Sequence, residues 1–240
     1  MLVGLDKARL NQLPLRFAGV TIRMTPREVK PLRAIDPLLF QGSHPDTHTF
    51  LWYSTLSTPE VNGSSGAEEY YEGQLNMSWP VRSPADEVPH AHRDRVAMMK
   101  TMAGPFEDRL KAAVENIPND SQVLEIKLQD WPTQAWDNRQ GRATLVGDAA
   151  HAMTMYRGEA FNHGITDAAR LSEQLVHAYR AGTGYKGAVE VYEAEMRPRT
   201  RAAVLLSRQA CLDAHDLKAL TPDSPLVSKR ATVLEPGTAE

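Results

Sequence analysis

Apolar residues recur along this chain with two different periods, and the period of two dominates the first third. Between residues 16 and 82 short apolar runs are separated by turn-forming residues such as His44-Pro45-Asp46. A period of two places alternate side chains on one face, so each run predicts a β-strand. Asn62-Gly63 indicates a further turn, and we expect residues 60–64 to form an exposed loop. The predicted strands occupy residues 17–24, 37–41, 49–54 and 70–79.

Helical spacing takes over in two later regions. Residues 93–102 place Val96, Met99 and Met102 on one side of a helix, and Pro105 is a suitable first residue for a second helix. The final third predicts helices over residues 185–197 and 199–217, with Pro198 kinking or interrupting the pattern between them. Beyond residue 221, repeated Pro, Ser and charged residues predict a flexible tail.

The two patterns meet in residues 141–178. The apolar run at residues 143–146 predicts a buried strand, which ends at Gly147-Asp148. Beyond Gly158 apolar residues recur at steps of three and four, which predicts a helix. A strand that leads through a turn into a helix is typical of sites for anionic cofactors, because the free N–H groups of the helix start attract phosphate.

Two further strands are expected, over residues 121–128 and over residues 2–6. Together these elements predict an α+β fold: a mixed β-sheet domain with two helices, a strand–turn–helix segment and C-terminal helices. We expect four segments, namely residues 1–13, 14–130, 131–220 and 221–240.

Composition and charge exclude several classes of function. The net charge is −3 and the pI is near 6.3, so nothing favours nucleic acid or an anionic membrane surface as a partner. The single cysteine, Cys211, cannot form an internal disulfide and suits a reducing compartment. No apolar run is long enough to span a membrane and no secretory signal is recognisable, so we expect a cytoplasmic protein. Histidine pairs at 44/48 and 90/92 lack accompanying ligands, so no metal site is predicted.

The segment beginning at Gly141 carries a longer motif. It matches the pattern G-R-x-x-L-x-G-D-A-A-H-x-x-x-P-x-x-G-x-G-x-N at ten positions, and departs from it at Met155, in place of proline, and Ala160, in place of glycine. The matching residues are Gly141, Arg142, Leu145, Gly147, Asp148, Ala149, Ala150, His151, Gly158 and Asn162. This pattern resembles the second FAD fingerprint of the flavin-dependent aromatic hydroxylases related to para-hydroxybenzoate hydroxylase and phenol hydroxylase.

Two weaker matches accompany it. Residues 130–138 are similar to the family's D-W-P-x-x-x-W-D-N segment. Residues 2–10 are similar to its L-V-G-A-D-G-x-x-S motif, although Lys7 and Leu10 replace the glycine and the serine. The G-x-G-x-x-G turn that holds the ADP half of FAD in the family is absent from the sequence. The resemblance therefore implies the remnant of an α/β FAD-binding fold that begins in the middle of the family's sequence.

The resemblance also implies which residues would bind the cofactor. Asp148 would accept hydrogen bonds from the ribityl and pyrophosphate region of FAD, and the backbone of residues 155–162 would run along the isoalloxazine ring. The implied FAD-binding residues are Asp6, Gly147, Asp148, Ala149, Met155, Gly158, Ala160 and Asn162. No catalytic side chain is assigned, and His151 is interpreted as structural.

The function implied by the resemblance is FAD-dependent monooxygenation of an aromatic or polyketide-like metabolite, by hydroxylation or epoxidation, with NADH or NADPH as reductant. Three alternatives stay open: a non-redox cyclase or isomerase that uses the same apolar cavity without flavin, an inactive remnant, and a pure binding protein. Because the ADP-binding half is absent from the sequence, we also expect either a homodimer or a separate partner chain to complete the fold.

Overall fold

The computed structural model describes residues 2–4 and 7–228, and these form two compact units. Unit 1 combines Met1–Leu13, Gln129–Asp213 and Leu220–Glu240, and unit 2 combines Pro14–Leu128 with Ala214–Ala219. Asp6, one of the implied cofactor residues, lies outside the described residues. Within the described part of the chain, no helix has the length and apolar character required to cross a bilayer.

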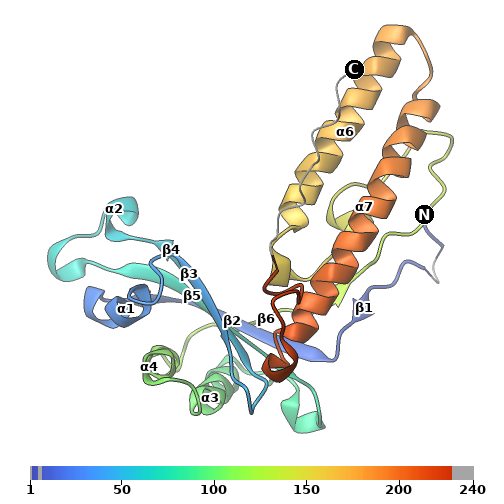
Figure 1. Ribbon diagram of the computed structural model, residues 1–240. Helices are drawn as coiled ribbons and strands as arrows, with labels where there is room; N and C mark the ends of the chain where they lie inside the picture. The colour runs from blue at the N-terminus through green and yellow to red at the C-terminus, as the bar shows by residue number, and fades with distance from the viewer. Residues whose placement is uncertain (1, 5–6, 229–240) are drawn as a thin grey trace. The chain divides into compact units, whose positions relative to one another are not determined.

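Unit 2 is built on a five-stranded antiparallel sheet with the order β3-β4-β5-β2-β6 (Figure 1). Its strands are β2 (Leu15–Met24), β3 (Leu39–Ser43), β4 (Phe50–Ser57), β5 (Tyr71–Pro80) and β6 (Leu124–Glu125). The strand predictions at residues 17–24, 37–41, 49–54 and 70–79 each fall on one of these strands, with β3 displaced by two residues. Alternation of apolar and polar residues was therefore a sound indicator here.

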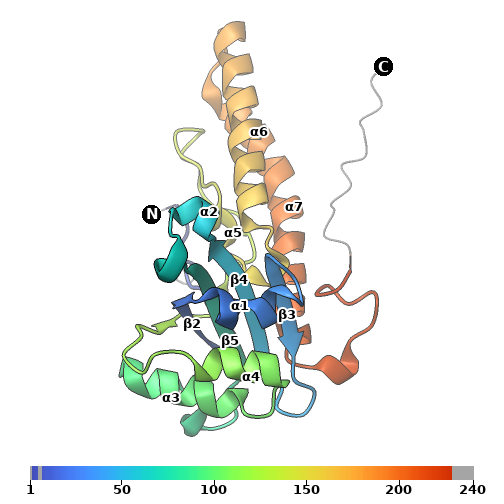
Figure 2. The same cartoon turned by 90° about the vertical axis from the view of Figure 1, so that its left-hand side faces the viewer.

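One face of this sheet carries the core of unit 2. Val20, Leu51, Tyr53, Leu75 and Met77 are at most 2% exposed and belong to one cluster of buried apolar side chains. Three helices cover this face (Figures 1 and 2): α1 (Pro26–Arg33), α3 (His92–Ala103) and α4 (Asp108–Glu115). Because strand side chains alternate, the residues between these core positions point to the opposite face.

The ends of these helices explain their limits. Thr25 and Glu28 form a reciprocal capping box at the start of α1, which satisfies two backbone donors. The predicted helix opening at Pro105 instead begins at Asp108, because the Glu107 side chain accepts a hydrogen bond from the Arg109 N–H. The shorter helical elements of unit 2 are α2 (Pro59–Asn62), η1 (Gly66–Glu68), η2 (Pro84–Asp86) and η4 (Leu217–Ala219).

Two sequence predictions in unit 2 need correction. The exposed loop expected at residues 60–64 begins as α2, which ends at Gly63 in the left-handed conformation. The strand expected over residues 121–128 is reduced to β6, two residues long, because only Leu124 and Glu125 pair with β2. An apolar run predicts a strand only as far as a partner strand extends beside it.

Unit 1 is dominated by two long helices that lie side by side (Figures 1 and 2): α6 (Ala160–Ala181) and α7 (Tyr185–Asp213). Of the two outcomes predicted for Pro198, a kink or an interruption, the interruption is wrong, since α7 runs through Pro198 as one helix of 29 residues. Proline forfeits one backbone hydrogen bond, but Met196 and Thr200 beside it are completely buried, so packing outweighs the local preference. The remaining elements are β1 (Asn11–Gln12), β7 (Gln129–Asp130), α5 (Asp148–His151) and η3 (Met155–Arg157).

The strand predicted at residues 143–146 is also wrong. These residues have no ladder partner among the described residues, and Val146 is 42% exposed. Side chains of α7 hold the segment instead: the Tyr192 hydroxyl donates to the Leu145 carbonyl, and Thr144 donates to Glu193. Residues 2–4 are not in a strand either. The mixed helix and sheet class is confirmed, but the strand–turn–helix segment is a coil–turn–helix segment.

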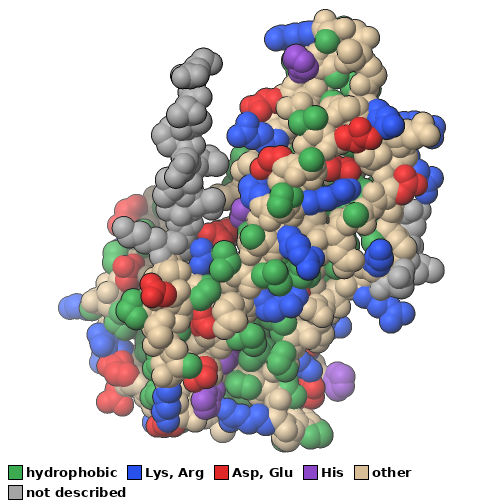
Figure 3. All heavy atoms as spheres, turned by 45° about the vertical axis from the view of Figure 1, so that its right-hand side comes forward, with side chains coloured by type: hydrophobic (Ala, Val, Ile, Leu, Met, Phe, Trp, Pro, Cys, Tyr) green, Lys and Arg blue, Asp and Glu red, His purple; other side chains and the backbone are tan. Residues whose placement is uncertain are grey.

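The predicted flexible tail is packed at its beginning. Residues 221–228 form turns, Leu226 is buried, and the Pro225 carbonyl accepts a hydrogen bond from Arg157. These contacts all lie within unit 1. On the face drawn in Figure 3, acidic and basic side chains are interspersed, so no extended surface of one charge forms there.

Candidate functional site

The Gly147-Asp148 turn is the centre of the candidate site. Gly147 has φ +57° and ψ −143°, a conformation that side-chain-bearing residues rarely adopt. Its carbonyl accepts from the N–H groups of Ala150 and His151, so α5 starts directly behind it. A Cβ added at Gly147 would meet no heavy atom within 4 Å, and the Asp148 side chain is exposed. The turn therefore has open space beside the Gly147 Cα and an exposed Asp148 carboxylate.

A pocket of about 550 Å³ joins this turn to the beginning of α6. Its walls come from Gly147 and Asp148 on one side and from α6 on the other, with Ala160, Phe161, Gly164, Ile165 and Ala168. No side chain caps α6, because the Glu159 carboxylate at the N-cap binds Arg157 at 2.9 Å and 3.1 Å instead. The first N–H groups of α6 are therefore available to a ligand.

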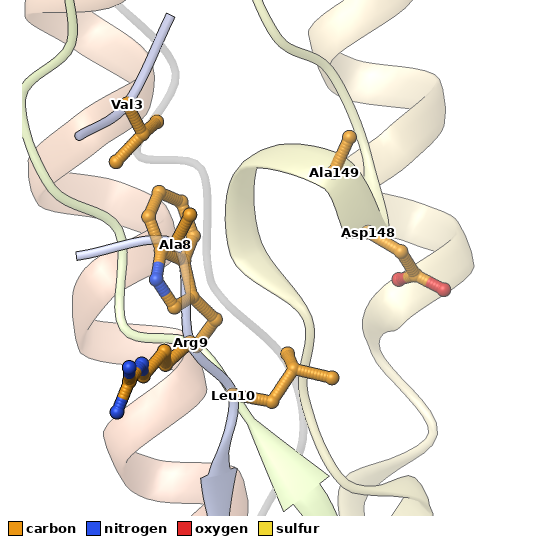
Figure 4. Close-up of a pocket in the computed structure, with 7 residues that line it drawn as sticks. Val3, Ala8, Arg9, Leu10, Asp148 and Ala149 are labelled. Atoms are coloured by element: carbon orange, nitrogen blue, oxygen red, sulfur yellow. The ribbon is translucent and has the colours of Figure 1, made fainter. Parts of the chain in front are cut away.

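A second pocket, of about 260 Å³, lies on the other side of the turn. Asp148 and Ala149 face the N-terminal segment across it, and Val3, Ala8, Arg9, Leu10 and Trp131 complete the lining (Figure 4). In this view the Asp148 carboxylate points away from the N-terminal segment. The indole N–H of Trp131 donates to the Lys7 carbonyl at 2.8 Å, which ties that segment to residues 129–131.

The structure brings together some of the implied cofactor residues and separates others. Gly147, Asp148 and Ala160 share the larger pocket, while Ala149 faces the smaller one. Met155 begins η3, and Gly158 ends it in the left-handed conformation, with φ +65°. Asn162 is exposed in the first turn of α6.

A buried carboxylate that the sequence analysis did not identify supports the turn from behind. Asp167 of α6 is completely buried, and its Oδ2 accepts from the Gly147 N–H at 2.9 Å and from His151 Nε2 at 2.5 Å. Its Oδ1 accepts from the Arg199 guanidinium at 2.9 Å. The interpretation of His151 as structural agrees with its complete burial. One carboxylate thus connects the turn, α5, α6 and α7.

The charges in this cluster are mutually compensated. Burial alone would raise the pKa of Asp167, but the hydrogen bonds from His151, Gly147 and Arg199 outweigh it and hold that pKa below its ordinary value. Arg199 also binds Glu195 at 2.7 Å and lies 2.9 Å from His163 Nδ1. Burial, followed by the Arg199 charge, lowers the pKa of His163. The Arg199 guanidinium is thus shared by the carboxylates of Asp167 and Glu195, and the lowered pKa of His163 favours its uncharged form.

A signal for this carboxylate was present in the sequence. Positions 163, 167, 171, 175 and 178 share one side of the predicted helix, and Asp167 is the only acidic residue among them. A carboxylate on a buried helical face is rarely tolerated unless it is paired. Its partner Arg199 lies 32 residues away on another helix, so no local pattern could have identified it.

The segment at residues 130–138 also anchors unit 1. Asp130 is completely buried and binds Arg208 through two contacts, at 2.6 Å and 2.7 Å. The Trp136 indole N–H donates to Glu193 at 2.8 Å, and Glu193 in turn binds Arg197 at 2.6 Å. These bonds fix the segment against α7.

The residues around the turn fit part of a flavin nucleotide. Asp148 is an exposed acceptor suited to hydroxyl groups, and the uncapped start of α6 suits a phosphate. The larger pocket is lined by no Lys or Arg side chain, so phosphate binding there would depend on backbone N–H groups. Among the described residues, no group of three or more His, Cys, Asp or Glu is placed to hold a metal ion.

Known proteins resemble this chain in sequence. The family model described as "FAD binding domain" matches residues 68–207. The chain is 46% identical over 234 residues to the FAD-dependent monooxygenase dbaB of Emericella nidulans, covering 97% of this chain and 52% of that protein. It is 41% identical to a probable FAD-dependent monooxygenase of Arthroderma benhamiae, over 91% of this chain and 53% of that protein. The chain therefore spans about half the length of these relatives.

A solved structure shows the same fold at much lower identity. The putative FAD-containing monooxygenase of Photorhabdus luminescens superposes with a TM-score of 0.68 at 16% identity, over 90% of this chain and 58% of that one. The family match covers more than half of the chain and includes the Gly147-Asp148 turn and α6. This chain belongs to the FAD-dependent monooxygenase family.

Proposed function

We propose that the chain contributes to the FAD site of a monooxygenase that hydroxylates or epoxidises an aromatic or polyketide-like metabolite. The observation that carries the proposal is the pocket of about 550 Å³ in which Gly147 and Asp148 face the uncapped start of α6. Bound FAD, reduced by NADH or NADPH, would supply the oxygen chemistry, and the chain would bind and orient it.

Each group in the pocket has a separate task in this proposal. Asp148 accepts hydrogen bonds from the hydroxyl groups of the ribityl chain, because a carboxylate is an acceptor without a donor at neutral pH. Gly147 allows the cofactor to approach the backbone closely, since it has no side chain and the space beside its Cα is open. Asp167, from behind the turn, orients the Gly147 N–H without contacting the ligand. The cytoplasmic location and a partner or second copy stay predictions.

Titration with FAD tests the proposal directly. The purified chain is titrated with FAD, and the quenching of flavin fluorescence and the visible absorbance spectrum are recorded. Saturable binding is expected, and Asp148→Asn should weaken it about tenfold or more, because a hydrogen bond to a charged acceptor contributes roughly 1.5–3 kcal/mol. Asp108→Asn, an exposed carboxylate at the start of α4, is the matched control. Binding that is unaffected by Asp148→Asn would refute this role for the turn.

A further inference from the structure

A buried ion pair lies directly before the first residue of α6. Arg157 Nε donates to Glu159 Oε2 at 2.9 Å, and Arg157 Nη2 donates to Glu159 Oε1 at 3.1 Å. The two residues are only 6% and 8% exposed. Arg157 Nη1 donates to the Pro225 carbonyl, so the C-terminal segment also holds the guanidinium. Because a bidentate pair is directional as well as strong, Arg157 fixes the orientation of the Glu159 carboxylate.

The same carboxylate belongs to the residue from which a side chain normally caps a helix. Glu159 is the N-cap residue of α6, and N-cap side chains usually accept from the second or third N–H group of the helix. Glu159 makes no such bond. The His163 N–H donates to the Glu159 carbonyl, so the N–H groups of residues 160–162 precede the first bond of the helix. Arg157 therefore keeps away from α6 a carboxylate that would otherwise cap it.

An unpaired carboxylate at this position would oppose the binding of an anionic ligand. It would occupy N–H groups that the ligand needs, and its charge would offset the partial positive charge of the helix start. Ala160, directly after Glu159, lines the larger pocket, and no Lys or Arg side chain lines it. Its lining already includes the Asp148 carboxylate. A second carboxylate would therefore disfavour phosphate unless a cation binds it, and Arg157 is that cation.

The family fingerprint specifies neither member of this ion pair. In the pattern G-R-x-x-L-x-G-D-A-A-H-x-x-x-P-x-x-G-x-G-x-N, Arg157 and Glu159 fall on unspecified positions on either side of Gly158. Gly158 has φ +65°, the left-handed conformation that ends η3, and α6 starts two residues later. The contacts of the pair, and not the resemblance, therefore indicate what it does in this chain.

We infer that Arg157 is a positioning residue for the cofactor site. By binding Glu159, it keeps the start of α6 uncapped and free of an unpaired carboxylate, so that the N–H groups of residues 160–162 receive an anionic group of the ligand. Arg157 itself does not touch the ligand. The inference deepens the proposed function and rests on it, because the ligand is the FAD that the larger pocket would hold. The state of these N–H groups in the free chain nevertheless requires no flavin.

A double-mutant cycle on the full chain, read by FAD titration, tests this role. Arg157→Gln should weaken FAD binding about tenfold or more, because the released Glu159 carboxylate competes for the N–H groups and repels the ligand. In a chain that already carries Glu159→Gln, the same change should alter the affinity by less than about threefold, because no carboxylate is released. An equal loss of affinity in the two backgrounds would mean that Arg157 acts only through packing, and would overturn the inference.

If circular dichroism shows that Arg157→Gln does not fold, Arg157→Lys takes its place in the cycle. Lysine keeps the charge but cannot form two parallel bonds to Glu159, so it should weaken FAD binding about threefold, and Glu159→Gln should again remove the effect. An effect of Arg157→Lys that persists in the Glu159→Gln background would also overturn the inference.

Amide hydrogen exchange, followed by NMR on the same variants, tests the role without FAD. The N–H groups of residues 160–162 should exchange rapidly in the wild-type chain. Arg157→Gln should slow the exchange of at least one of them about threefold or more, because the Glu159 carboxylate now accepts from it. A role limited to packing predicts the opposite sign, since a loosened helix start exchanges faster. Unchanged or faster exchange in Arg157→Gln would overturn the inference.

Arg197→Gln is the matched control. Arg197 also binds a buried carboxylate of unit 1, that of Glu193, at 2.6 Å, but Glu193 lies inside α7 and not at a helix start. This variant should lower the free energy of unfolding and leave the FAD affinity within about twofold of the wild-type value. A loss of affinity as large as that of Arg157→Gln would trace the effect to any broken ion pair, against the inference.

The two measurements separate this inference from the proposed function. If the wild-type chain does not bind FAD but Arg157→Gln slows exchange at residues 160–162, the proposed function fails and Arg157 still keeps the helix start uncapped. FAD binding that Arg157→Gln leaves unaffected would refute the inference alone.

Discussion

Among single substitutions in unit 1 that conserve side-chain volume, Asp167→Asn should be one of the most destabilising. The carboxylate is completely buried and accepts three hydrogen bonds, from Gly147, His151 and Arg199. An asparagine side chain presents one acceptor oxygen and one NH₂ group. In either orientation of the amide, NH₂ faces at least one buried donor, and Arg199 keeps only the Glu195 carboxylate as a counter-charge.

The magnitude follows from the bonds lost. Two hydrogen bonds to a charged acceptor are removed or weakened, and at roughly 1.5–3 kcal/mol each the loss is about 3–6 kcal/mol. Removing one partner of a buried ion pair gives a similar range, about 3–5 kcal/mol. His151 can change tautomer and accept from the new NH₂ group, which places the expected value near the lower end, at about 3 kcal/mol.

Urea unfolding followed by far-ultraviolet circular dichroism measures this loss. The midpoint of unfolding should fall while its slope stays constant, because the surface exposed on unfolding is unchanged. Glu173→Gln is the control, since Glu173 forms an exposed pair with Arg170 on α6 that contributes at most about 1 kcal/mol. If Asp167→Asn shifted the free energy of unfolding by no more than this control, the carboxylate would not hold the turn as described.

Three further predictions concern other buried features. Gly141→Ala should destabilise the folded chain by about 1–3 kcal/mol, since the φ of Gly141 is +78° and a Cβ there would lie 2.4 Å from the Lys186 backbone. Gly187→Ala in α7 is the comparison: its Cβ would meet nothing within 4 Å, so it should stabilise the chain by up to about 1 kcal/mol. Thermal unfolding of the two variants measures the difference. Because folding lowers the pKa of His163, the unfolded state binds a proton at this residue more readily, so the free energy of unfolding should decrease as the pH falls below about 6.5. In urea titrations, His163→Gln should reduce this dependence of the free energy of unfolding on pH. Burial raises the pKa of the Cys211 thiol, so iodoacetamide should modify this thiol only after the chain unfolds. Mass spectrometry follows the modification, and rapid alkylation of the native chain would contradict the burial of Cys211.

The sequence by itself determined the elements whose signal is local. Alternation predicted β2, β4 and β5, because each has one face buried against helices, and a long three-and-four period predicted α6 and most of α7. The G-R-x-x-L-x-G-D-A-A-H motif indicated the family, because the turn needs a glycine at positive φ followed directly by a carboxylate, and both are adjacent residues in the sequence.

Only the tertiary structure decided the features that depend on partners distant in the chain. Residues 143–146 carry a strand's composition but form none, since no strand pairs with them in the described part of the chain. Pro198 does not end α7, because the side chains around it are buried. The two residues that together support the Gly147 turn, Asp167 and Arg199, come from different helices, α6 and α7. Likewise, Trp52, Asn76 and Gly19 become cross-strand neighbours only when three strands adopt their register. Pairing and burial are properties of the folded chain, and local patterns carry no information about which distant residue supplies them.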